Sequence, residues 1–156
     1  SGAAGGHCRA GSECQVSAME QSALKVQNIL PHRPPMLMVD RILSLGDDCC
    51  AAVKYVSQAE PAFQGHFPDK PVFPGVLMIE AMAQTCTVVL MQKFPEQTPL
   101  FAGVENARFR RMAVPGDVLQ LEGTLVLVKN GFYTFEASAS VDGIAACTAR
   151  LIIAMR

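Results

Sequence analysis

The stretch GHFPDKPVFPGVLMIEAMAQ, from Gly65 to Gln84, combines a loop histidine with a single carboxylate in an apolar run. His66 can accept a proton near neutral pH, as a general base must. Glu80 would favour its protonated form in apolar surroundings, because burial penalises the charged carboxylate. Such a pair suits proton removal next to a carbonyl group and protonation of a leaving group. Taken alone, the two residues could equally be an ordinary loop histidine and a helix glutamate that faces water.

A helix start is expected between these two residues. Proline is well placed at the beginning of a helix, and Pro74 is followed by Gly75, which lets a ligand approach the backbone closely. The first N–H groups of a helix lack partners within it, so they could stabilise an oxygen that gains negative charge. Alternatively, Pro74-Gly75 could be a plain turn into a helix. Gln84 follows Glu80 by one turn and could orient its carboxyl through a hydrogen bond, or could be a satisfied core amide.

A second histidine, His32, lies in the segment PHRPP. It has neither a carboxylate nor a helix start close to it in the sequence. His66 has the helix start at Pro74-Gly75 and the acid Glu80 downstream of it. The pattern therefore ranks His32 below His66 as the catalytic histidine.

The composition limits the classes of function. A chain of 156 residues is long enough for one domain with a real core, and 50% of it is hydrophobic whereas 17% is charged. This apolar excess predicts a well-filled interior or an interface with another subunit. The formal net charge of -1 gives no electrostatic reason to expect a nucleic acid or an anionic membrane as a partner.

The six cysteines show no C-x-x-C spacing, and no signal peptide is recognisable. We therefore expect free thiols and a cytoplasmic protein. His7, Cys8 and Cys14 match no zinc pattern and lack a fourth ligand, so no metal site is expected.

The first 18 residues are rich in Gly, Ala and Ser without a periodic apolar face, which is typical of a disordered tail or an expression remnant. Ser17 and Glu20 form an S-x-x-E capping box, which predicts a helix that Pro31 stops. A single domain is therefore expected over residues 19–156.

Most of the remaining chain is expected to form strands. Two strands are predicted over 36–45 and 49–57, and another over 100–111. The C-terminal part predicts an antiparallel meander, because Asn130-Gly131 and Asp142-Gly143 are strong two-residue hairpin signals.

The predicted central helix, over 76–91, contains Glu80 as its only charged side chain. A helix that is apolar on nearly every side is buried on nearly every side. A membrane span is disfavoured, because the segment is shorter than about 20 apolar residues and contains Glu80, Gln84 and two threonines. One such helix with about six antiparallel strands predicts an α+β layer in which a single sheet curls around the helix. The uncovered side of that helix would need another subunit.

The stretch from Gly65 to Gln84 resembles the signature of the β-hydroxyacyl-(acyl-carrier-protein) dehydratases of bacterial type II fatty acid synthesis, which are hot-dog-fold lyases. LPHRPPMLMVDRI before it and AGVENARFRRMAVPGD after it are similar to two further segments of that family, in the same order. The resemblance covers essentially Leu30 to Met155. It implies a hot-dog fold, with an antiparallel sheet wrapped around a long central helix, and an obligate homodimer that commonly assembles as a trimer of dimers.

The same resemblance implies a site shared between two subunits, with His66 as the catalytic histidine from one and Glu80 as the catalytic acid from the other. Gly75, and with it Val76, would offer backbone N–H groups to a thioester carbonyl. The implied reaction removes water from a (3R)-hydroxyacyl thioester to give the trans-2-enoyl thioester, without a metal or organic cofactor. The related dehydratase-isomerase branch has aspartate at the acid position, so Glu80 points to the branch without dedicated isomerisation.

The partner implied is an acyl carrier protein, which is acidic. A basic patch could dock it, or could be a solvated strand end without a partner; its candidate members are Arg108, Arg110, Arg111 and Lys129. Two other functions stay open, namely an acyl thioesterase of the same fold and a non-enzymatic module that binds acyl thioesters.

Overall fold

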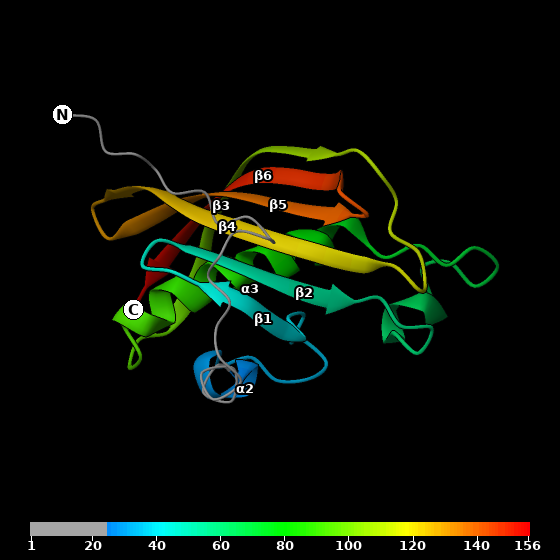
Figure 1. The fold of residues 1–156 in the computed structure, drawn as a ribbon, viewed down its shortest axis with the longest axis horizontal. Helices are drawn as coiled ribbons and strands as arrows, with labels where there is room; N and C mark the ends of the chain where they lie inside the picture. The colour runs from blue at the N-terminus through cyan, green and yellow to red at the C-terminus, as the bar shows by residue number, and fades with distance from the viewer. Residues whose placement is uncertain (1–24) are drawn as a thin grey trace.

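The computed structural model describes residues 25–156, in which one long helix lies across a face of a curled antiparallel sheet (Figure 1). The helical elements are α2 (Val26–Ile29), the short 3-10 helix η1 (Pro61–Gln64) and α3 (Gly75–Lys93). The strands are β1 (Arg41–Leu45), β2 (Cys49–Tyr55), β3 (Pro99–Phe109), β4 (Val118–Lys129), β5 (Phe132–Val141) and β6 (Ile144–Met155). The predicted tail and capping box lie outside the described residues.

The strand predicted over 36–45 is the one that differs most, because β1 begins only at Arg41. The N–H groups of Met36 and Leu37 both bond back to the carbonyl of Arg33, and that of Met38 bonds to the side chain of Gln84. These donors are therefore used by a turn and by α3. A backbone N–H committed in this way is not available to a sheet ladder.

The six strands follow the order β1-β2-β4-β5-β6-β3, and each neighbouring pair is antiparallel. The two predicted hairpins are confirmed: the turn residues Asn130, Gly131, Asp142 and Gly143 all have positive φ, between 51° and 78°. Positive φ at both central residues is the geometry of a type I′ turn, whose twist matches that of the flanking strands. These turns fix β4, β5 and β6 as a continuous meander.

α3 forms the centre of the core and packs against β2, β4, β5 and β6. By length and composition it could cross a membrane, but 67% of its most apolar window is buried inside the fold. The sheet covers the apolar side chains of this helix, as expected for a helix that is apolar on nearly every side. The long apolar run is thus explained by the core of an α+β hot-dog fold.

β3 stands at one edge of the sheet, and most of its residues are exposed. Leu100, Phe101, Val104 and Phe109 are between 44% and 54% exposed. An open strand edge presents unpaired backbone groups, and together with apolar side chains it is a ready template for pairing with another chain.

Cys50, Cys86 and Cys147 are buried free thiols. Burial raises the pKa of Cys50 to about 12, so this group stays a thiol and is chemically inert near neutral pH. Cys49 is disulfide-bonded, so the expectation that all six cysteines are free is wrong at that position.

Close packing between α3 and the sheet is expected to make Gly123→Ala destabilising. A Cβ atom at Gly123 would lie 2.6 Å from the sulfur of the fully buried Cys86. Overpacking of this kind costs about 1–3 kcal/mol in the free energy of unfolding, measurable by urea denaturation. Gly65→Ala is the matched control, since its Cβ would meet nothing within 4 Å. Equal stability of the two variants would contradict the packing described.

Candidate active site

His66 lies in the loop between η1 and α3, which projects beyond the end of the sheet (Figure 1). Its ring Nδ1 lies 2.8 Å from the carbonyl oxygen of Val72, and its own backbone carbonyl accepts from the Val72 N–H at 3.0 Å. A carbonyl can only accept a hydrogen bond, so Nδ1 carries the proton and Nε2 keeps its lone pair. This tautomer is the one that a general base requires.

His66 and Gly75 line one pocket at the start of α3, together with the ring of Phe109. The N–H groups of Leu77 and Met78 bond to the carbonyl of Pro74. The N–H groups of Gly75 and Val76 have no helix carbonyl one turn before them to bond to. They are therefore the donors that point out of the N-terminus of α3. A Cβ at Gly75 would lie 2.7 Å from the ring of Phe109, so glycine is the residue that fits here.

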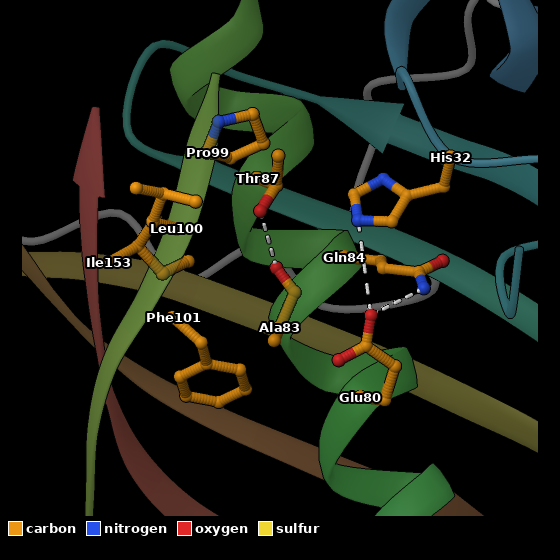
Figure 2. A pocket seen from close by; sticks show the side chains of 9 residues that line it. All are labelled: His32, Glu80, Ala83, Gln84, Thr87, Pro99, Leu100, Phe101 and Ile153. Carbon is orange, nitrogen blue, oxygen red and sulfur yellow. Dashed lines mark hydrogen bonds and ion pairs between the residues drawn. The ribbon is translucent and has the colours of Figure 1, made fainter. Parts of the chain in front are cut away.

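Glu80 lies in a different pocket, where it meets the side chain of Gln84 (Figure 2). The predicted hydrogen bond is confirmed: Nε2 of Gln84 donates to Oε1 of Glu80 at 2.7 Å. The Glu80 side chain is 21% exposed, so in a single chain it is neither fully buried nor open to water. The opposite wall of this pocket is apolar and comes from the start of β3 and from β6, through Pro99, Leu100, Phe101 and Ile153.

Gln84 is a fully bonded core amide as well as a partner of Glu80, so both alternatives considered for it hold. It is 1% exposed, its Oε1 accepts from the Met38 N–H at 2.8 Å, and its Nε2 also donates to the Met36 carbonyl at 2.7 Å. The segment before β1 is thereby fastened to α3 beside the candidate acid.

The expectation that His32 has no carboxylate near it is wrong for the folded chain. Its Nε2 lies 3.9 Å from Oε1 of Glu80, although the two residues are far apart in the sequence. The cause is the bonding of Gln84 to the segment that follows His32, which brings that segment over α3. Sequence spacing carried no signal of this contact.

One chain does not bring His66 and Glu80 into the same pocket. His66 shares its pocket with the helix start at Gly75, whereas Glu80 shares another with His32 and Gln84. A single chain therefore holds the candidate base and the candidate acid in two separate pockets.

Comparison with known proteins decides the family. The family model of the FabA-like domain matches residues 30–150. The chain belongs to the FabA-like domain family.

Among curated relatives, the 3-hydroxyacyl-(acyl-carrier-protein) dehydratase FabZ of Oenococcus oeni is 46% identical over 138 residues, covering 86% of this chain and 99% of that protein. The protein of the same name from Latilactobacillus sakei subsp. sakei is 48% identical, covering 81% and 93%.

Two solved structures share the fold. The dehydratase heterocomplex ApeI:P from Xenorhabdus doucetiae gives a TM-score of 0.72 at 24% identity, over 85% of this chain and 91% of that one. A mutant of the thioesterase PA1618 from Pseudomonas aeruginosa gives 0.59 at 17%, over 74% and 79%. The hot-dog fold therefore houses both activities, and the fold does not choose between them.

The basic residues of this FabA-like domain do not form one patch. Arg110 and Arg111 line the pocket of His66, and Arg108 precedes them on β3. Lys129 on β4 pairs with Phe132 on β5, and Phe132 pairs with Ala154 on β6. Ala154 in turn pairs with Leu100 on β3, which lies at the opposite end of that strand from Arg108. The inclusion of Lys129 in the docking patch is thus wrong, because the long β4 strand carries it to the far end of the sheet.

Within residues 25–156 of this FabA-like domain, no group of three or more histidine, cysteine, aspartate or glutamate side chains could hold a metal ion. The His7, Cys8 and Cys14 set lies outside the described residues.

The His32 side chain should make the stability of this FabA-like domain sensitive to acid. Burial lowers the pKa of His32 below 6.5, and Glu80 opposes that shift in part. The unfolded chain then binds a proton more readily than the folded one, so stability falls as pH drops below about 6.5 towards the folded pKa. His32→Gln should lose less stability than the wild type between pH 7.5 and 5.5, measured by urea denaturation. Identical losses would contradict a depressed pKa.

Proposed function

We propose that this chain is an enzyme that removes water from (3R)-hydroxyacyl-(acyl carrier protein) to give the trans-2-enoyl product, in the elongation of fatty acids. The FabZ relatives, at 46% and 48% identity over most of both chains, support this activity. The observation that carries it is the Nδ1–H bond of His66 to Val72, which leaves a basic Nε2 beside the N-terminus of α3.

The proposed mechanism gives each of three groups one task. Nε2 of His66 takes a proton from the carbon next to the thioester carbonyl, and the Gly75 N–H stabilises the developing enolate oxygen. The electrons of the broken C–H bond form the C=C bond while the C–O bond to the hydroxyl breaks. Glu80 gives its proton to the departing hydroxyl, which leaves as water. No group is oxidised or reduced, so no redox cofactor is needed.

We propose that the acid acts on a substrate held by the His66 of a second copy of the chain, in a homodimer. Two features support this. His66 and Glu80 line separate pockets in one chain, and most of the apolar wall of the Glu80 pocket comes from β3, an edge strand of the sheet. Pairing of β3 with a second copy would cover its exposed apolar side chains. We further propose that three such dimers assemble into a trimer of dimers.

Docking of the acyl carrier protein is proposed at Arg108, Arg110 and Arg111. Two of these three arginines line the pocket that contains His66, so an acidic partner bound there would lie close to the candidate base. We also propose a cytoplasmic location, which the free thiols of Cys50, Cys86 and Cys147 support.

The test is incubation of the protein with two kinds of acyl carrier protein thioester, one with a 3-hydroxyacyl chain and one with a plain acyl chain. Dehydration produces the ultraviolet absorbance of an enoyl thioester without release of thiol. Free thiol from either substrate, with no enoyl product, would show a thioesterase. Tight binding without turnover of either substrate would show a non-enzymatic module.

A further inference from the structure

His32 has no role in the mechanism above, yet its ring is directed at the candidate acid. It projects from the segment between α2 and β1, and Figure 2 shows its Nε2 facing Oε1 of Glu80. The separation of 3.9 Å is longer than a hydrogen bond. Hydrogen bonds between catalytic groups are often long in a free enzyme and shorten when the substrate is bound.

The two ring nitrogens of His32 are in different surroundings. Nδ1 is buried and finds no hydrogen-bond partner among residues 25–156. Burial also lowers the pKa of the ring, so the neutral form prevails near pH 7. A buried N–H without a partner is rarer in proteins than a buried acceptor without one. The single proton of the neutral ring therefore belongs on Nε2, where it faces the carboxyl of Glu80.

The backbone that carries His32 is fixed on both sides. The guanidinium of Arg33 donates to the carbonyls of Gln27, Leu30 and His32, at 2.7–3.0 Å. Beyond it, Gln84 bonds to the backbone of Met36 and Met38. A ring held by its own segment in this way is pre-positioned and does not have to be ordered when the substrate binds.

Both side chains are directed at the same oxygen of the acid. Gln84 bonds to Oε1 of Glu80, and His32 faces that same atom. Oε2 makes no hydrogen bond to residues 25–156 and points away from both donors in Figure 2. A carboxyl whose one oxygen is held by two donors keeps its proton on the other, because the held oxygen is already saturated with donors.

We infer that His32 is a second positioning residue for the acid, which donates its Nε2–H to Oε1 of Glu80 and, with Gln84, keeps Oε2 and its proton for the substrate hydroxyl. This inference rests on the proposed dehydratase function. The PHRPP segment would then contribute to the reaction by positioning the acid.

Two amide replacements separate positioning from packing. The amide nitrogen of glutamine reaches the position of Nε2, whereas that of asparagine reaches only the position of Nδ1. His32→Asn is expected to lower kcat for dehydration about tenfold with little change in KM, whereas His32→Gln stays within about threefold of the wild type. Unchanged thermal denaturation of both variants serves as the control for folding. Equal kcat values for the two variants would overturn the inference.

A measurement independent of activity tests the same inference. Nitrogen-15 NMR of imidazole-labelled protein, with the His32 signal assigned by its loss in His32→Gln, reports which ring nitrogen carries the proton. The proton is expected on Nε2 at pH 7.5, and a proton on Nδ1 would overturn the inference. Absence of dehydration by the wild type would instead overturn the proposed function, and with it the positioning role, whatever the tautomer.

Discussion

Replacing His66 with asparagine is expected to lower kcat/KM for dehydration by about 10²- to 10⁴-fold, the usual contribution of a general base. The asparagine amide can still donate to the Val72 carbonyl, as Nδ1 of the imidazole does at 2.8 Å. It offers no basic nitrogen in place of Nε2. The change therefore removes basicity while it keeps the hydrogen bond that holds the loop. Enoyl absorbance with a 3-hydroxyacyl-(acyl carrier protein) substrate measures the rate.

The control for the His66 variant is its stability. The melting temperature should match that of the wild type within about 2 °C, because the side chain is partly exposed and its bond to Val72 is retained. Wild-type activity in a folded His66→Asn protein would show that another group removes the proton.

Replacing Glu80 with glutamine should have an effect of similar size, about 10²- to 10⁴-fold in kcat/KM, because it removes the acidic proton. The amide oxygen of glutamine can still accept from Nε2 of Gln84, which the carboxyl does at 2.7 Å. The volume and the bond to the core are preserved, so the loss should be in kcat rather than in KM. The same enoyl assay measures it.

Glu80→Asp is the comparison for that variant, because it keeps a carboxyl but shortens the side chain by one methylene. It should retain more activity than Glu80→Gln, since a displaced acid still supplies a proton. A glutamine variant more active than the aspartate variant would show that the carboxyl serves only as a hydrogen-bond acceptor.

Local patterns predicted much of this fold. Asn130-Gly131 and Asp142-Gly143 predicted hairpins because so few residues adopt positive φ without strain, and both turns adopt it. The helix predicted over 76–91 begins one residue earlier and ends two residues later. Its side chains are apolar because the sheet that packs around the helix buries most of them.

The contacts that the sequence did not predict all join distant segments. His32 meets Glu80 because Gln84 bonds to the segment after His32, and no local spacing encodes such a bond. The same bond withdraws Met38 from β1, which is shorter than its β-like sequence suggests. Lys129 was grouped with the arginines by charge alone, whereas the register of β4, β5, β6 and β3 separates them.

A site shared by two subunits is the central claim, and mixing inactive variants tests it most directly. Subunits with His66→Asn and subunits with Glu80→Gln are dissociated together, reassociated and assayed for dehydration. A mixed dimer contains one doubly altered site and one intact site, so random reassociation should restore about a quarter of the wild-type activity per subunit. Mixed dimers that form but remain as inactive as either parent would contradict a site built from His66 of one chain and Glu80 of the other.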